Sequence, residues 1–371
     1  MKLILQIKLL PSEKQFGDLK RTILESNKAC NAISDIAWGK RVFNKYRLQR
    51  IVYYSIKNTF KLTAQVVVRC LCKVSDAYKK DKKTKRVFKP LGAITYDTRI
   101  LSYNMAKQEV SIWSVDGRLK IPFVCHNAKY LPYIKGEADL VFNKGKFYLF
   151  QTVEVIEEDV HDVEKFIGVD FGVNQIATLS NGTQFGSEQL NDVRNKYYKT
   201  RKSLQSKGTR GSRKCLKRLS GREHRFATIT NHTIAKQIVA KAQSQNTGIA
   251  IEDLTNIRDT TIVHKGQRRK HHSWSFAQLR LFLEYKAKLL GIPLEVVEAA
   301  YTSQTCSVCH SIGKRRGNIF RCTYCGNVMD ADINAARNIA QLGLLVNQPE
   351  KMSVPKFVCH IPLKAHDFSR G

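Results

Sequence analysis

Two carboxylates end apolar stretches in the second half of the chain. Asp170 closes the run Ile-Gly-Val-Asp at residues 167–170, and Glu252 closes Ile-Ala-Ile-Glu at 249–252. A buried strand disfavours a carboxylate unless the group is paired or binds a cation. The alternative is an acid at a strand end that faces water or caps a helix. Because the context occurs twice, we expect both acids at one edge of a sheet, where they bind divalent cations.

A third acid lies at the start of a predicted helix in CGNVMDADINAARNI, residues 325–339. An apolar stripe that begins at Ile333 predicts a helix that packs on a sheet. Asp332 falls in its first turn or at its N-cap, and N-capping is the alternative role because Asp is a favoured cap. We assign the metal-binding role to Asp332 and a capping or supporting role to Asp330.

Three carboxylates provide the hard oxygen ligands that Mg²⁺ prefers. Two such ions about 4 Å apart can activate a water and stabilise the leaving oxygen of a phosphodiester. The expected reaction is therefore metal-dependent phosphodiester hydrolysis, with two Mg²⁺ ions as cofactors.

Four of the ten cysteines form two Cys-x-x-Cys pairs with twelve residues between them: Cys306, Cys309, Cys322 and Cys325. Four thiolates so spaced are typical of a closed, structural Zn²⁺ site. A pair of redox disulfides or a metal-free ribbon are the alternatives. The other cysteines are scattered, so we expect buried thiols in a reducing cytoplasm.

Sixty-three Lys and Arg against 31 Asp and Glu give a net charge of +32. A positive potential of this size attracts polyanions, so nucleic acid is the expected partner rather than a membrane. A generically basic protein of the ribosomal or chromatin kind is the alternative. No apolar run approaches the roughly 20 residues that span a bilayer.

The cations concentrate in three segments. Residues 194–225 carry thirteen Lys and Arg and one acid, and residues 79–89 carry seven cations and one acid. A solvated helical face or a disordered segment is the alternative to phosphate binding. The expected nucleic-acid contacts are Arg201, Lys202, Arg210, Arg213, Lys214, Lys217, Arg218 and Arg222, then Lys82, Lys83, Lys85 and Arg86, and Arg268 and Arg269 in the loop after Glu252. Four aromatics among cations either stack on bases or belong to the core: Trp38, Tyr46, Tyr53 and Tyr54.

The elements that must position these residues follow from periodicity. Residues 12–85 have helix-period patterns, and residues 86–160 read as strands with a hairpin at Asn143-Lys144-Gly145. From residue 161 we expect three strands, a helix, a strand, a helix and a strand. That order is the order of an RNase H-type nuclease core. The predicted fold class is multidomain α+β.

Four segments together resemble TnpB, the transposon-encoded RNA-guided endonucleases related to the miniature type V CRISPR effectors: IGVDFGVNQIATLSNG, IAIEDL, YTSQTCSVC and CGNVMDADINAARNIA. The resemblance covers roughly residues 164–345. It implies a RuvC-type nuclease whose acids fall on Asp170, Glu252 and Asp332, the last in the D-x-N-A-A pattern. It also implies a guide RNA, a double-stranded DNA target read beside a short adjacent motif, and cleavage of both strands in turn by one site.

The resemblance implies a domain order as well. A wedge β-barrel (1–11 and 86–160) is interrupted by a helical recognition lobe (12–85). A RuvC-like nuclease (161–304 and 327–347) then contains a zinc ribbon (305–326), and a flexible tail (348–371) follows. The chain departs from the family at His310, where a Gly is usual.

Two other functions share parts of this reasoning. A nuclease-inactive, RNA-guided DNA-binding repressor would usually have lost one of the three acids, and this chain keeps all three. A structure-specific junction resolvase would need neither the N-terminal 160 residues nor the ribbon. We expect a cytoplasmic prokaryotic protein that needs no protein partner and acts as a monomer.

Overall fold

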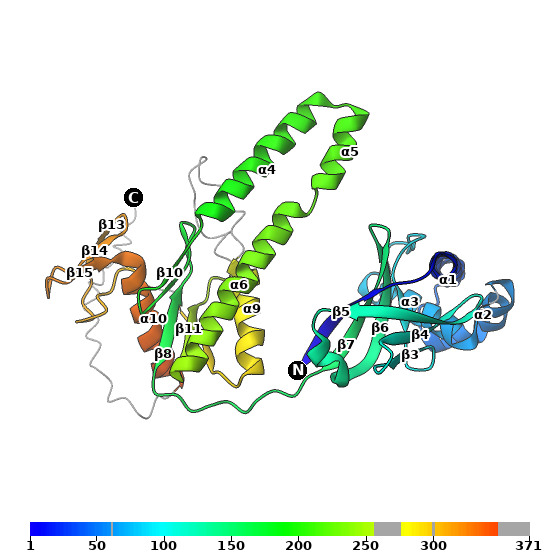
Figure 1. The fold of residues 1–371 in the computed structure, drawn as a ribbon, viewed down its shortest axis with the longest axis horizontal. Helices are drawn as coiled ribbons and strands as arrows, with labels where there is room; N and C mark the ends of the chain where they lie inside the picture. Colours follow the sequence, from blue (N-terminus) through cyan, green and yellow to red (C-terminus); the bar gives the residue numbers. More distant parts are fainter. Residues whose placement is uncertain (61, 256–275, 299–300, 348–371) are drawn as a thin grey trace, which may run out of the picture. The chain divides into compact units, whose positions relative to one another are not determined.

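The protein is described by a computed structural model that covers residues 1–60, 62–255, 276–298 and 301–347. The chain divides into two compact units, Met1–Ile156 and Glu157–Gly371. Figure 1 shows the elements of each. Within the described ranges, no helix combines the length and the apolar character needed to cross a bilayer.

The helix-period pattern of residues 12–85 forms three helices that pack on one another in the first unit. They are α1 (Glu13–Lys40), α2 (Lys45–Phe60) and α3 (Ala64–Lys80). Helix α1 begins at a capping box, in which the Ser12 hydroxyl accepts from the Gln15 backbone and the Gln15 side chain accepts from the Ser12 backbone. This reciprocal pair satisfies two helix-end donors and fixes where the helix starts.

The rest of the first unit is a seven-stranded antiparallel sheet in the order β2-β6-β7-β1-β5-β4-β3. Its strands are β1 (Lys2–Leu9), β2 (Ile94–Tyr96), β3 (Leu101–Asn104), β4 (Glu109–Ser114), β5 (Gly117–Cys125), β6 (Ile134–Asn143) and β7 (Lys146–Glu154), with the 3₁₀ helix η1 (Ala128–Tyr133) before β6. The two edge strands, β2 and β3, are joined by only four residues, 97–100. Because so short a segment spans at most about 18 Å, the sheet must curve back on itself.

The predicted hairpin at residues 143–145 is confirmed between β6 and β7. Lys144 and Gly145 have φ of 50° and 76°. Two consecutive positive φ values are characteristic of the tight turn whose twist matches the flanking strands.

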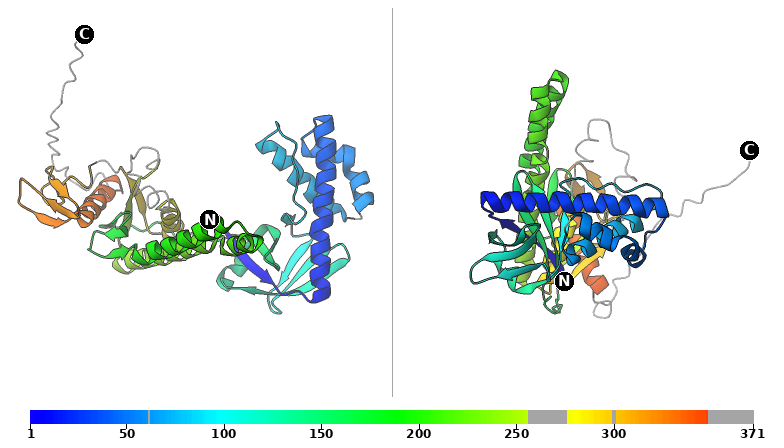
Figure 2. Two further views of the ribbon diagram at one scale, coloured as in Figure 1. Left: turned by 90° about the horizontal axis from the view of Figure 1, so that it is seen from above. Right: turned by 90° about the vertical axis from the view of Figure 1, so that its right-hand side faces the viewer.

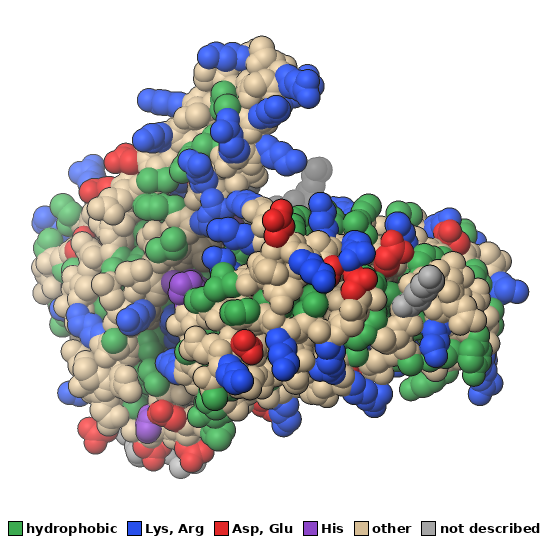
Figure 3. Space-filling view, turned by 45° about the vertical axis from the view of Figure 1, so that its right-hand side comes forward, with side chains coloured by type: hydrophobic (Ala, Val, Ile, Leu, Met, Phe, Trp, Pro, Cys, Tyr) green, Lys and Arg blue, Asp and Glu red, His purple; other side chains and the backbone are tan. Residues whose placement is uncertain are grey.

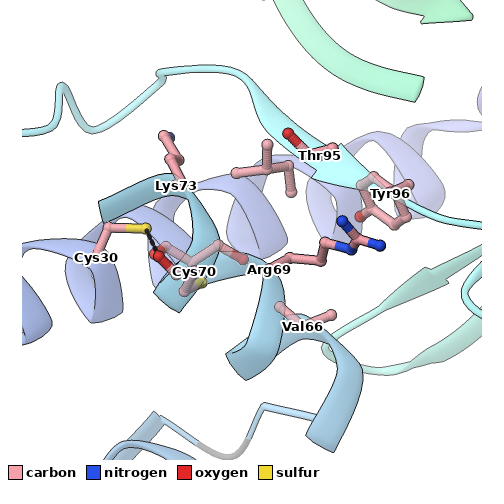
Figure 4. A pocket seen from close by; sticks show the side chains of 9 residues that line it. Cys30, Val66, Arg69, Cys70, Lys73, Thr95 and Tyr96 are labelled. Atoms are coloured by element: carbon pink, nitrogen blue, oxygen red, sulfur yellow. Dashed lines mark hydrogen bonds between the residues drawn. The ribbon is translucent and has the colours of Figure 1, made fainter. Parts of the chain in front are cut away.

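Polar contacts join helix α3 to the residues on either side of strand β2, and Figure 4 shows α3 beside this strand with Arg69 and Lys73 labelled. The Arg69 guanidinium lies 2.6 Å from the Asp97 carboxylate, and Lys73 Nζ donates to the carbonyl oxygen of Ala93 at 2.7 Å. The cavity among these side chains is about 10 Å³, which admits one water at most. Its thiols therefore belong to the core, as predicted for the scattered cysteines. The described ones are buried or half-buried: Cys30, Cys70, Cys72, Cys125 and Cys215.

The second unit contains a five-stranded sheet in the order β10-β9-β8-β11-β12. Its strands are β8 (Phe166–Asp170), β9 (Gln175–Leu179), β10 (Gln184–Gly186), β11 (Gly248–Glu252) and β12 (Leu294–Val297). Strands β8, β11 and β12 are parallel, whereas β9 and β10 are antiparallel to their neighbours. The predicted order of strands and helical regions is confirmed, except that three helices lie between β10 and β11 where one was predicted.

Helices cover both faces of this sheet (Figures 1 and 2). The helices of this unit are α4 (Glu188–Lys207), α5 (Arg210–Leu219), α6 (Arg222–Gln245), α9 (Phe276–Leu289) and α10 (Ala331–Asn347), of which α6, α9 and α10 cover the sheet. Ile167, Val169, Ile249 and Ile251 pack with α6 and α9 on one face. On the other face, Phe166 and Ala250 pack against α10, as the two-residue period of a strand requires.

Helix α10 lies directly on the strands because glycines leave room for it. A Cβ added to Gly168 would fall 1.8 Å from the carbonyl oxygen of Ala336, and one added to Gly343 would fall 2.4 Å from the Cβ of Ala250. No real side-chain atom tolerates such distances. Both glycines are therefore required for α10 to pack this closely on the sheet. In the sequence Gly-Val-Asp of β8, the glycine serves this packing and the aspartate is the candidate metal ligand.

A small three-stranded antiparallel sheet precedes α10. It consists of β13 (Lys314–Arg316), β14 (Ile319–Arg321) and β15 (Val328–Asp330). Strand β15 runs directly into the helix. The ribbon sheet therefore ends at residue 330 and not at residue 326, the end that the sequence predicts. The ribbon and the helix that carries Asp332 are thus one continuous piece of structure.

Candidate metal centre and nucleic-acid interface

Asp170 and Glu252 lie at the same level of adjacent parallel strands. The register pairs Val169 with Ile251, and each acid is the next residue along its strand. By alternation, Asp170 shares a face with Gly168, and Glu252 shares it with Ala250. That face is the one covered by α10. The expected convergence of these two acids at one sheet edge is therefore present.

Helix α10 brings Asp332 to the same place. Ala336 lies over Gly168, and Asp332 precedes Ala336 by one helical turn, about 5.4 Å. Asp170 follows Gly168 by two strand residues, about 6.6 Å. Since the helix runs from the open edge of the sheet back over the strands, the two displacements point the same way, and Asp332 faces Asp170.

Asp330 has the capping role. Its Oδ1 accepts hydrogen bonds from the backbone N–H groups of Asp332 and Ile333, both at 3.0 Å. These are the donors that an N-cap side chain normally satisfies. The helix consequently starts at Ala331, two residues earlier than the apolar stripe indicated, and the Asp332 carboxylate is not needed for the cap.

The grouping of the acids changes how Asp170 titrates. Burial, and then the negative charges of Glu252 and Asp332, raise the pKa of Asp170 to about 8, although the positive charge of Arg315 opposes the shift. Burial also raises the pKa of Glu252, against a hydrogen bond from Thr302 that lowers it. Two buried acids with raised pKa values favour the binding of a cation between them.

Two polar side chains form a hydrogen bond and an ion pair with the acids, and neither was predicted from the sequence. Thr302 Oγ1 donates to Glu252 Oε1 at 2.5 Å, and both side chains are buried. The Arg315 guanidinium, from β13 of the ribbon, lies 2.9 Å from Asp332 Oδ1. Thr302 and Arg315 are 50 and 17 residues away from the acids that they contact. No local pattern reveals contacts at those separations.

The residues around the three acids suit Mg²⁺. All three candidate ligands are carboxylates, which Mg²⁺ prefers to nitrogen or sulfur. Thr178 pairs with Asp170 across β8 and β9, and its hydroxyl is buried without a hydrogen-bond partner in the described protein. Buried polar groups are normally paired. The Thr178 hydroxyl could therefore form its hydrogen bond with a water that a cation at Asp170 would hold.

The four cysteines of the ribbon come together as predicted. Their sulfurs all lie within 4.8 Å of one another, with Cys309 and Cys322 at 3.5 Å and Cys306 and Cys325 at 3.7 Å. A tetrahedral zinc site with Zn–S bonds of about 2.3 Å has sulfur–sulfur edges of about 3.8 Å. The cluster is therefore compatible with Zn²⁺, and the distances are too long for disulfides.

His310 follows the first cysteine pair in an unusual conformation, with φ of 61°. A left-handed backbone here explains why Gly is usual at this position in the family that the sequence resembles. His is among the residues that tolerate it better than β-branched or bulky ones do. The departure therefore leaves the cysteine ligands in place.

Most of the predicted phosphate contacts lie on a helical hairpin formed by α4, α5 and the start of α6. The hairpin extends beyond the sheet of its unit, and Figure 3 shows Lys and Arg side chains crowded on it. Arg201 is half-buried and paired with Glu223 at 2.5 Å. The other predicted cations of this segment, all apart from Arg201, are exposed: Lys202, Arg210, Arg213, Lys214, Lys217, Arg218 and Arg222.

The second basic segment is partly engaged within the protein. Arg86 lies 2.5 Å from Asp81, and Lys85 lies 2.8 Å from Asp35. Lys82 and Lys83 are exposed. The remaining two predicted contacts, Arg268 and Arg269, lie outside the described residues, as does the predicted tail, 348–371.

The four aromatics of the helical region differ in exposure. Tyr53 is half-buried and lies edge-on against Tyr54, with ring centroids 5.2 Å apart. Trp38 stacks on Tyr78 inside the first unit, and the Arg41 guanidinium lies over the Trp38 ring, 3.9 Å from its centroid. Tyr46 and Tyr54 are 70% and 76% exposed on α2, a helix with four cations and no acid. Base stacking is thus open to these two tyrosines, whereas Trp38 belongs to the packing of the helices.

The raised pKa of Asp170 predicts a pH-dependent stability. The unfolded chain releases this proton near pH 3.9, whereas the folded chain keeps it to about pH 8. Between these values the folded state binds more protons, so stability falls as pH rises, by at most about 1.4 kcal/mol per unit. Without added Mg²⁺, Asp170→Asn should raise the urea midpoint of the second unit more at pH 8 than at pH 5.

The exposed aspartate of α4, Asp192, provides the control. Asp192→Asn should shift the midpoint equally at both pH values. A gain from Asp170→Asn that does not grow with pH would show that the folded chain does not raise the pKa of Asp170.

Several known proteins have sequences similar to this chain. Residues 276–339 match the family model described as Cas12f1-like, TNB domain. The TnpB-like protein MJ0751 of Methanocaldococcus jannaschii is 28% identical over 264 residues, which is 69% of this chain and 89% of the relative. The match to the family model spans α9, β12, the four cysteines and the start of α10.

Two CRISPR-associated endodeoxyribonucleases named Cas12f1 are also similar. The protein of Sulfoacidibacillus thermotolerans is 33% identical over 218 residues, or 53% of this chain and 50% of the relative. That of Syntrophomonas palmitatica is 29% identical over 305 residues, or 76% and 56%. This chain thus spans about half the length of these two relatives. With the family model and MJ0751, they confirm the predicted resemblance of the chain to TnpB-like proteins and miniature type V effectors.

Proposed function

We propose that this protein is an RNA-guided, metal-dependent DNA endonuclease of a transposon, which cleaves double-stranded DNA next to a short adjacent motif. The observation that carries the proposal is the meeting of Asp170, Glu252 and Asp332 at one edge of a sheet. The proposal is further supported by the similarity of the chain to proteins named endodeoxyribonucleases.

Asp170 and Glu252 would hold two Mg²⁺ ions together with Asp332. When bound, Mg²⁺ supplies an activated water at neutral pH and offsets the charge that develops on the phosphate. The chain contributes rigid ligands, because two of the acids end hydrogen-bonded strands and the third lies in a capped helix. This arrangement fixes the carboxylates before the substrate arrives, so little reorganisation is needed during the reaction.

Arg315 lies on the open side of the proposed site. Its side chain is 38% exposed and contacts Asp332, whose side chain is 13% exposed. A guanidinium in this position offers paired N–H donors to a phosphate oxygen of the substrate. We infer that Arg315 orients the scissile phosphate above the three acids.

The nucleic acids would bind to the basic surfaces. The hairpin of α4, α5 and α6 grips phosphates of the guide RNA or the DNA, and exposed Tyr46 and Tyr54 stack on bases. In the proposed domain order, the wedge barrel (1–11 and 86–160) and the helical lobe (12–85) hold the RNA and the duplex. The nuclease (161–304 and 331–347), the ribbon (305–330, extended to the end of β15) and the tail (348–371) work as a monomer.

The two neighbouring aspartates give a matched test of the nuclease site. In the complex of the chain with its copurified RNA and Mg²⁺, Asp332→Asn should reduce cleavage of a matching DNA target by about 100-fold or more. Asp330→Asn should cleave nearly as well as the wild type, because Asn is as good an N-cap as Asp. Equal losses would contradict the division of roles, and cleavage by Asp170→Ala would exclude the site.

Neutralising the hairpin tests the nucleic-acid interface. Replacing both Lys214 and Lys217 with Gln should weaken binding and make the slope of log K against log salt shallower by about 0.7 to 0.9 for each phosphate that is no longer neutralised. Arg201→Gln is the control, because Arg201 already pairs with Glu223, and it should change the slope less. The slope is measured separately for guide RNA and duplex DNA. An unchanged slope for both would contradict the assignment.

A further inference from the structure

The segment between β12 and the ribbon, residues 302–307, connects the two metal centres. At its start, the Thr302 hydroxyl donates to Glu252 Oε1 at 2.5 Å. Thr302 is 4% exposed and Glu252 is 7% exposed, so water does not compete for this hydrogen bond. At its other end, the segment supplies Cys306, the first cysteine of the ribbon cluster.

Helix α10 holds this segment through two buried asparagines. Asn338 Nδ2 donates to the carbonyl oxygens of Thr302 and Thr305, at 2.8 and 2.7 Å. Asn334 Nδ2 also donates to the Thr305 carbonyl, at 2.7 Å, and its Oδ1 accepts from the Ser307 backbone at 2.9 Å. Asn334 is 0% exposed and Asn338 is 5% exposed. The helix that carries Asp332 therefore also fixes the residue that holds Glu252.

The hydrogen bond from Thr302 restricts the orientation of the Glu252 side chain. A Glu side chain has three torsions, and Glu252 has no other side-chain hydrogen-bond donor among the described residues. The Thr302 hydroxyl occupies one lone pair of Oε1 and leaves the other oxygen available as a ligand. Thr302 is in turn positioned by its main-chain bond to Asn338, which follows Asp332 on α10.

We propose that Thr302 is a positioning residue that orients the Glu252 carboxylate for divalent cations. Asn334 and Asn338 join this orientation to the folded zinc ribbon. The proposal rests on the proposed function, since it deepens the account of the same site. Groups that hydrogen-bond to a metal ligand typically change metal affinity by 10- to 100-fold when they are removed.

The test compares three substitutions in the full chain without nucleic acid. Thr302→Val keeps the shape and removes the hydroxyl, whereas Thr302→Ser keeps the hydroxyl. Thr305→Val is the matched control, because it removes a hydroxyl from the same segment and retains the carbonyl that both asparagines use. Electron paramagnetic resonance measures the free Mn²⁺ that remains in solution, which gives the amount bound. The Mn²⁺ that the Asp170→Asn variant still binds is subtracted as binding outside the proposed site. Zinc content is measured alongside.

We expect Thr302→Val to weaken Mn²⁺ binding by about 10- to 100-fold, with zinc content unchanged. Thr302→Ser and Thr305→Val should bind Mn²⁺ within about threefold of the wild-type affinity, a change well below the loss expected for Thr302→Val. Wild-type affinity in Thr302→Val, or an equal loss in Thr302→Ser, would overturn the proposal. If Thr302→Val loses zinc or unfolds, the comparison of Thr302→Ala with Thr302→Ser decides in the same way.

This readout separates the inference from the proposed function. A wild-type chain that binds Mn²⁺ through Asp170 but does not cleave an RNA-matched target would remove the proposed function and leave the inference standing. A wild type that cleaves, with Thr302→Val binding Mn²⁺ normally, would remove only the inference.

Discussion

The close contact between α10 and the sheet is the constraint on which the proposed centre depends. Gly168 and Gly343 allow the helix backbone to lie against β8 and β11 without intervening side chains. Any side chain at Gly168 would displace the helix and move Asp332 away from Asp170. The same contact sets the position of Asn334 and Asn338, and through them the segment that leads into the ribbon. A packing requirement thus determines the geometry of a chemical site.

The electrostatic character of the site contrasts with the rest of the molecule. The chain has a net charge of +32, yet three carboxylates meet at one edge of the sheet of the second unit. In the second unit, cations occupy the exposed hairpin, where they meet water or phosphate at little desolvation cost. Burying acids together is unfavourable without a cation. The raised pKa values of Asp170 and Glu252 therefore indicate a site arranged for cation binding rather than for stability.

Much of this arrangement could be predicted from the sequence, because its signals are local. Asp170 and Glu252 stood out as polar ends of apolar strands, and the cysteine spacing indicated their cluster. The order of strands and helices followed from periodicity and matches the sheet. The choice between Asp330 and Asp332 depended on where the helix begins, which the N-cap hydrogen bonds of Asp330 now fix.

The parts that the sequence did not reveal are long-range contacts. Thr302 and Arg315 reach acids in other elements, and nothing in their neighbouring residues distinguishes them from surface polar residues. Trp38 and Tyr54 looked alike among cations, but only the packing of three helices shows that one is covered and the other is exposed. The engagement of Arg86 by Asp81 is a tertiary detail of the same kind.

The central claim is that Asp170, Glu252 and Asp332 form one divalent-metal centre. Anomalous scattering from crystals of the protein soaked in Mn²⁺ tests it most directly. The account predicts anomalous peaks with carboxylate oxygens of Asp170 and Glu252 at about 2.1 to 2.2 Å, close to the spacing expected for Mg²⁺, and Asp332 beside them. Strong Mn²⁺ peaks elsewhere in the second unit, with none at these three carboxylates, would contradict it.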